Sequence, residues 1–211
     1  MATTSDYFLA WLRAQLGVSA GSIDDLLSLF LSDPKYAAKD LSDLVTGQES
    51  IPRLIASGSS SPVSGTLRLT YFTARKTETI NNVRTQTGST AAATTTLARI
   101  GLYSVTIDET GGTLLASTAN DVNLWNAANT GYTKAFTAPI GVNAGQRYAL
   151  GMLFVGTTPP TIIGSGSNQG LTAEAAQAPR LTSAMTGQAD LPGTLSGLSS
   201  SGMALYGVIT P

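Results

Sequence analysis

From residue 66 to 155, short apolar segments with a period of two residues recur every 12 to 20 residues, and one more such segment ends the chain. In "TLRLTYFT" (66–73), Leu67, Leu69 and Tyr71 occupy every second position. This alternation puts successive side chains on opposite faces of a strand, whereas a helix repeats every 3.6 residues. Similar segments follow as "ETINNVRTQ", "ARIGLYSVT", "TLLAST", "TKAFTAPI", "RYALGMLFV" and "GMALYGVIT".

The stretches between these segments have the residues of turns: "DETGG", "NTGY", "VNAGQ", "GTTPP" and "GSGSNQG". No helical run of twelve residues interrupts them, apart from a single turn in "NDVNLWNAAN" that Asp121 is placed to cap. The pattern predicts a mainly β chain of seven or eight strands. We expect an antiparallel β-sandwich of jelly-roll type, in which two sheets pack face to face.

Three of the expected strands place a glycine close to an aromatic residue, although glycine weakens a strand by about 0.5–1 kcal/mol. We expect each glycine to leave room for a ring, from the opposite sheet or from a neighbouring subunit, to lie close to the backbone. The pairs are Gly101 beside Tyr103, Gly151 near Tyr148, and Gly207 next to Tyr206.

The first 50 residues have a different pattern, with apolar residues at spacings of three and four and start and stop signals for three short amphipathic helices. The sequence therefore predicts a helical attachment or oligomerisation segment over 1–50, a serine-rich linker over 51–65 and a β-sandwich domain over 66–211. Three short helices bury little surface alone, so their apolar faces pack against the β domain or dock onto sister copies or another protein. The candidate docking residues are Phe8, Trp11, Leu12, Leu16, Leu27 and Phe30.

The chain has neither histidine nor cysteine. Histidine is the usual general base near neutral pH and the commonest metal ligand, and cysteine supplies thiolate chemistry. We therefore expect no catalytic centre, no metal and no cofactor. Asp108 and Glu109 in "TIDETGG" are interpreted as solvated turn residues, and a glycan-cleaving enzyme using carboxylates such as Asp108 and Asp121 is the least supported reading.

The formal net charge is −1, and no stretch approaches the 18 apolar residues of a membrane-spanning helix. Nucleic acid and anionic membranes both attract concentrated basic faces. The sequence therefore predicts neither of these as a partner. The N-terminus also lacks the pattern of a secretory signal.

Trp125 and Tyr132 lie within eight residues of one another, together with Asn126 and Asn129. An aromatic face beside amides is typical of a sugar site, which binds by stacking and by hydrogen bonds. In the other interpretation, which the pattern favours, Trp125 closes one end of the core while the asparagines form turns. Both interpretations stay open, and the first makes these four residues candidate contacts of a carbohydrate-binding module for host cell-wall glycan.

The strings "LTYFTARKTETINNVRTQTGSTAAATTTLARIGLYSV", "STANDVNLWNAANTGYTKAFTAPIGVNAGQRYALGMLFVGTTPP" and "ALYGVITP" resemble the β-rich domain of minor tail and other virion structural proteins of tailed bacteriophages that infect actinobacteria. The resemblance covers about residues 66–211. It implies a non-enzymatic part of a virus particle that is made in the bacterial cytoplasm, contacts other virion proteins and touches the host envelope or sister copies. It supplies no site residues. The three runs with glycine and tyrosine favour a homotrimer.

Overall fold

The computed structural model describes residues 47–165 and 177–211, and these form antiparallel β-structure. Six of the seven segments predicted from their alternation each form one strand. The seventh, 202–210, forms two short strands instead, Ala204–Leu205 and Gly207–Thr210, which belong to different sheets. A mainly β, antiparallel chain is therefore confirmed. The elements are β1 (Gln48–Glu49), the 3-10 helix η2 (Arg53–Ile55), β2 (Gly58–Ser60), β3 (Leu67–Thr73), β4 (Glu78–Gln86), β5 (Ala93–Val105), β6 (Gly112–Ser117), β7 (Gly131–Val142), β8 (Arg147–Thr158), β9 (Ile162–Ser165), β10 (Thr182–Met185), β11 (Thr194–Leu195), β12 (Ser199–Ser200), β13 (Ala204–Leu205) and β14 (Gly207–Thr210).

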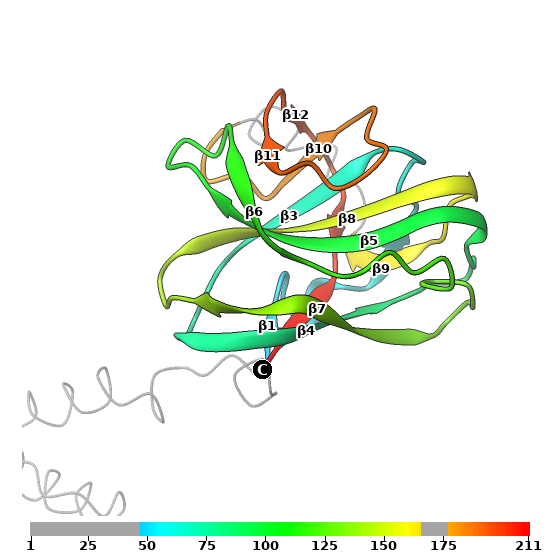
Figure 1. The fold of residues 1–211 in the computed structure, drawn as a ribbon, viewed down its shortest axis with the longest axis horizontal. Helices are drawn as coiled ribbons and strands as arrows, with labels where there is room; N and C mark the ends of the chain where they lie inside the picture. Colours follow the sequence, from blue (N-terminus) through cyan, green and yellow to red (C-terminus); the bar gives the residue numbers. More distant parts are fainter. Residues whose placement is uncertain (1–46, 166–176) are drawn as a thin grey trace, which may run out of the picture. The chain divides into compact units, whose positions relative to one another are not determined.

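The strands of the described residues form three sheets. The largest has seven strands in the order β11-β6-β5-β8-β3-β10-β12, and the second has the order β1-β14-β4-β7. A third, small sheet has the order β13-β9-β2. In Figure 1, β3, β8 and β5, the central strands of the seven-stranded sheet, lie above β4 and β7 of the four-stranded sheet. The strands at the edges of the larger sheet, β11 on one side and β10 and β12 on the other, lie farther from β4 and β7.

The two larger sheets share the main hydrophobic core. The seven-stranded sheet contributes Leu150, Met152 and Phe154 from alternate positions of β8, and the four-stranded sheet contributes Ile80 and Val83 from β4. Alternate residues of a strand face one side of a sheet. The predicted alternation thus places this apolar set between the two sheets.

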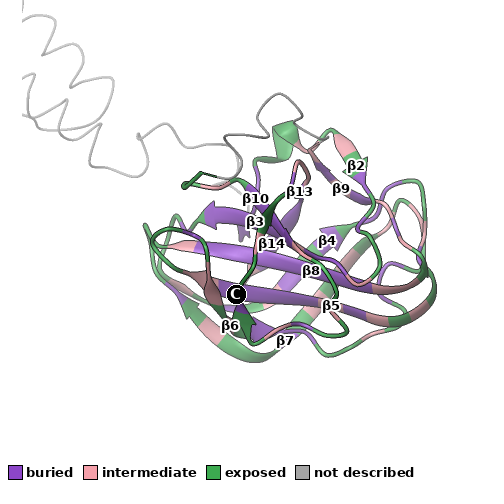
Figure 2. Cartoon of the chain, turned by 90° about the horizontal axis from the view of Figure 1, so that it is seen from above, coloured by how far each residue is buried: buried purple, intermediate pink, exposed green. Residues whose placement is uncertain are grey.

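The opposite face of the seven-stranded sheet is also buried, which the alternation did not predict. Leu67 and Leu69 on β3 pack there with Leu153 on β8, and Leu191 and Leu195 from the chain after β10 cover them. Seven consecutive residues of β8, from 148 to 154, are buried as a result. Figure 2 shows this continuous burial along β8.

A pair of glycines allows the second core to pack closely against the sheet. Gly101 on β5 lies directly opposite Gly151 on β8, and a Cβ on either would come within 3.0 Å of the Tyr103 ring. The expectation of a ring lying on glycine backbone is confirmed here, but the ring comes from β5 itself rather than from an opposite sheet or subunit. At Gly207 the atoms that come close are aliphatic, with Leu150 Cδ2 2.4 Å from the position of a Cβ.

The region expected to be a linker, 51–65, differs from that expectation. Ile51 is 2 % exposed, and β2 pairs with β9 over Gly58–Ser60. These residues belong to the same compact unit as the later strands, Val45–Pro211. Strand pairing uses backbone N–H and C=O groups, so a serine-rich composition does not exclude it. Of the expected helical segment 1–50, residues 1–46 lie outside the described residues, and Gln48–Glu49 form β1.

We expect Gly151→Ala to lower the free energy of unfolding by about 1–3 kcal/mol, because the added methyl group would overlap with Tyr103 and with Leu67. Gly141→Ala on β7 is the matched control, since its Cβ would meet no atom within 4 Å. The control should stay within about 0.5 kcal/mol of the parent. Urea unfolding measures both variants, and equal stabilities would contradict the packing described.

Candidate functional site

Trp125 is in the core and offers no ring face to a ligand. Its side chain is 0 % exposed, and the indole Nε1 donates a hydrogen bond to Thr85 Oγ1 at 2.9 Å. A single turn capped by Asp121 positions it, because Asp121 Oδ1 accepts the backbone N–H of Asn123 at 2.9 Å. The interpretation in which Trp125 closes the core is therefore the one that the structure favours. Its burial removes the stacking surface that a sugar site at this position needs.

The other three candidate glycan contacts brace the loop that follows Trp125. The Tyr132 hydroxyl accepts the backbone N–H of Ala127 at 2.7 Å and donates to Asn126 Oδ1 at 3.1 Å. Asn129 has a left-handed backbone, with φ of 51°, and its N–H donates to Gly88 O at 2.7 Å. The structure thus brings Tyr132 and Asn126 together, as a support for the loop.

The six candidate docking residues of the N-terminal segment, Phe8, Trp11, Leu12, Leu16, Leu27 and Phe30, lie outside the described residues.

The candidate carboxylates have separate structural partners. Asp108 accepts hydrogen bonds from the hydroxyls of Thr106 at 2.6 Å and Thr110 at 2.7 Å, and these lower its pKa to about 2. Asp121 forms an ion pair with Lys134, and the hydrogen bond from that ammonium group lowers the pKa of Asp121. Asp108 fits the expected turn residue, and the two aspartates do not share a partner among the contacts of the described residues.

Glu109 differs from the expectation of a solvated turn residue, because it is only 3 % exposed. Its carboxylate accepts hydrogen bonds from Arg147 Nε and from the backbone N–H of Arg180. The Arg147 guanidinium also lies 5.9 Å from the centre of the Tyr71 ring. A left-handed φ of 55° turns Glu109 inward. The Glu109 carboxylate therefore links the β5–β6 hairpin to β8 and to the chain before β10.

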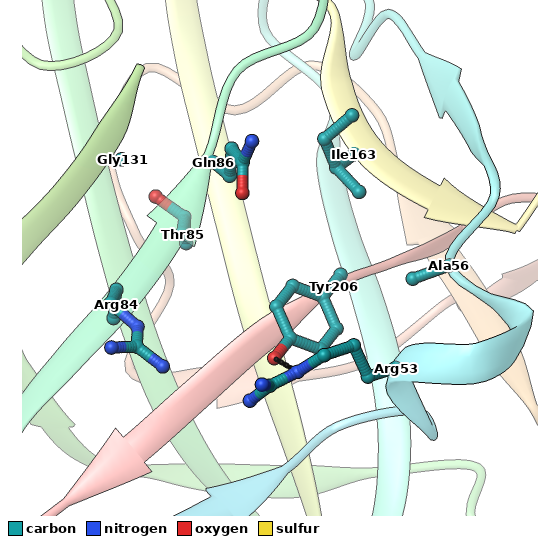
Figure 3. A pocket seen from close by; sticks show the side chains of 8 residues that line it. All are labelled: Arg53, Ala56, Arg84, Thr85, Gln86, Gly131, Ile163 and Tyr206. Atoms are coloured by element: carbon teal, nitrogen blue, oxygen red, sulfur yellow. Dashed lines mark hydrogen bonds between the residues drawn. The ribbon is translucent and has the colours of Figure 1, made fainter. Parts of the chain in front are cut away.

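A groove of about 450 Å³ lies over the four-stranded sheet (Figure 3). It is lined by Arg53, Ala56, Arg84, Thr85, Gln86, Gly131, Ile163 and Tyr206. Glu49 and Arg84 are both paired with Val208, on opposite sides of β14. Directly paired residues share a face of the sheet. This register therefore brings two distant parts of the chain to one surface.

A buried carboxylate holds Arg53 at one side of the groove. Glu49 Oε1 accepts hydrogen bonds from Arg53 Nη2 at 2.7 Å and from the Tyr206 hydroxyl at 2.8 Å, while Oε2 accepts the backbone N–H of Arg53 at 3.0 Å. The Glu49 side chain is 2 % exposed and that of Arg53 is 54 % exposed. Hydrogen bonds to Tyr206 and Glu49 raise the pKa of Arg53, and burial raises the pKa of Tyr206. The guanidinium thus stays charged and the phenol neutral.

Arg84 is at the other side of the groove, where its side chain is exposed. Within 47–165 and 177–211, its guanidinium has no hydrogen-bond or ion-pair partner. Figure 3 shows the guanidinium groups of Arg53 and Arg84 ending on either side of β14, with the Tyr206 ring close to Arg53. The groove therefore has two positive groups and one neutralised carboxylate at its rim.

Sequence reasoning missed this groove. Arg84 and Gln86 occupy alternate positions of a predicted strand, and the alternation indicates that they share a face. Nothing in the sequence indicates that β14 pairs with both β1 and β4, which is what places Arg53 near them.

The part of the chain that the structure describes contains no cluster of three acidic side chains suited to a metal ion. Its helices include none that is long and apolar enough to span a membrane.

No protein-family model matches the chain, and a comparison with curated protein sequences also gives no match.

We expect Thr85→Val to lower the free energy of unfolding by about 1–3 kcal/mol, because the buried Trp125 N–H would lose its acceptor. Thr133→Val, an exposed position on the neighbouring strand β7, is the control and should change stability by less than about 0.5 kcal/mol. In a Trp125→Phe background the Thr85 change should cost less, because that N–H is already absent. An equal cost in both backgrounds, measured by urea unfolding, would contradict this role for Trp125.

Proposed function

We propose that this chain is a non-enzymatic structural component of a bacteriophage particle, either a minor tail protein or another protein of the particle surface. Its N-terminal segment docks to the particle or to sister subunits, and its β domain, an antiparallel sandwich of jelly-roll type, is exposed. In this role the chain contacts other virion proteins and copies of itself.

The observation that carries the proposal is the use of the polar and aromatic side chains as braces. Trp125 is buried against Thr85, Glu109 is buried against Arg147, and Asp121 is paired with Lys134. Each of these contacts fixes a loop to a neighbouring strand. A module whose loops are held in this way suits a part that transmits load and keeps its shape within an assembly.

The segments that resemble virion proteins coincide with the central strands. "LTYFT" lies in β3, "ARIGLYSV" in β5 and "RYALGMLFVGTT" in β8. These three strands are adjacent in the middle of the seven-stranded sheet. The resemblance also covers other strands and loops, and its inclusion of residues that build the core supports the proposal of a shared architecture for the β domain.

The experiment that tests the proposal is mass spectrometry of purified particles of the phage that encodes this chain. Peptides from 66–211 should be found in the intact particles, and antibodies against the β domain should label particles in electron micrographs. Native mass spectrometry of the full chain should give a trimer with three times the chain mass of 21.7 kDa. A chain found in infected cells but missing from particles would overturn the particle role, and a monomer at high concentration would overturn the trimer.

Separate substitutions test the docking role of the N-terminal segment. Trp11→Ser and Phe30→Ser should reduce incorporation into particles, because both remove an apolar side chain from the expected docking faces. Leu54→Ser is the control, since Leu54 is 79 % exposed on η2 of the β domain. Equal incorporation of all three variants would contradict docking through these faces.

A further inference from the structure

We propose that the groove between Arg53 and Arg84 binds an anionic sugar unit, that is, a sugar that has a carboxylate or a phosphate group. The groove adjoins the loop of Trp125 and Tyr132 through Thr85 and Gly131, but neither aromatic residue lines it. The proposal does not depend on the particle role proposed above. The inference rests on charge, on neutral hydrogen-bonding groups and on the shape of the groove.

The charge of the groove selects for an anion. Glu49 offsets the charge of Arg53, whereas Arg84 lies two strands away from Glu49, a distance of about 10 Å at the usual strand spacing. Arg84 therefore has the uncompensated positive charge at this groove, and it attracts an anion beside it. Guanidinium groups match carboxylates and phosphates in geometry because they donate two parallel hydrogen bonds. Arg53 is already held in place by Glu49, which lowers the cost of ordering it.

Gln86 supplies a neutral donor and acceptor next to this charge. It lies two residues beyond Arg84 on β4 and is exposed on the same face. No side-chain hydrogen bond of Gln86 occurs within the described ranges. An amide both donates and accepts, as sugar hydroxyl groups do. An anion that only accepts hydrogen bonds could use the Gln86 N–H groups but would leave its carbonyl oxygen unused.

The shape of the groove suits a ring rather than an extended surface. Ala56 and Ile163 form an apolar side, as Figure 3 shows, and both pack on a small cluster that includes Tyr206. Gly131 lies opposite Gln86, and a Cβ placed on it would meet no atom within 4 Å. The volume of about 450 Å³ is in the range of small-molecule sites. A sugar ring has an apolar face of C–H groups and a polar rim, which fits these two sides.

The binding test uses the full chain and five probes in isothermal titration calorimetry. The probes are glucuronate, glucose 6-phosphate, glucose, acetate and inorganic phosphate. Both anionic sugars should bind, with glucose and the two free anions at least about tenfold weaker. Comparison of glucuronate with glucose 6-phosphate shows whether the site prefers a carboxylate or a phosphate. Binding of either anionic sugar should weaken as salt is added.

Three variants assign the binding to the groove. Arg84→Gln removes the unpaired charge and should weaken binding about tenfold or more. Gly131→Leu fills the groove without changing its charge and should also weaken binding. Lys76→Gln is the control, because it removes a positive charge that is paired with Glu78 away from the groove lining, and it should leave affinity unchanged. Thermal unfolding checks that each variant stays folded.

The proposal is overturned if neither anionic sugar binds, or if glucose or free phosphate binds as tightly as glucose 6-phosphate. It is also overturned if Arg84→Gln and Gly131→Leu both bind like the parent chain. Loss of binding in Tyr132→Ala, with binding kept in Arg84→Gln and Gly131→Leu, would place recognition at the other loop and would contradict the assignment to this groove.

Discussion

The contact of the Tyr103 ring with the backbone at Gly101 and Gly151 is the constraint on which the rest of this unit depends. Because these two positions have no side chain, the ring packs closely against the middle strands and contributes to a second core on that face. The chain after β10 covers this core and then returns through β13 to β14. Since β14 pairs with both β1 and β4, the groove beside Arg84 depends on the same return path.

The strands could be predicted because their alternation and turn residues are local signals. The second core could not, since Leu191 and Leu195 lie in a glycine-rich stretch without alternation. The pairing of β2 with β9 could not be predicted from side chains, because backbone groups form it. The burial of Glu109 could not be predicted either, because it depends on Arg147, which is 38 residues away. For the candidate site, the sequence indicated Trp125 and its neighbours. Whether the Trp125 ring is exposed to stack on a ligand or buried in the core depends on the three-dimensional structure.

The chain has few charged residues, and their positions explain both the braced loops and the charged groove. With charged residues at 12 % of the chain, most ionic groups of the described residues serve to fix a loop, as Asp121 does through Lys134. Arg84 is the contrasting case, because it has no partner among the described residues and lies beside a concave surface. Both features support the proposed role as an assembly part that has a recognition groove.

Native-state hydrogen exchange tests the central claim most directly, namely that the middle strands are buried on both faces. The amides of β8 from 148 to 154, together with those of β5 around Gly101, should exchange only through global unfolding, and more slowly than those of β7, which faces solvent along much of its length. Faster exchange in β8 than in β7 would contradict the account, because it would mean that the second face opens independently of the first.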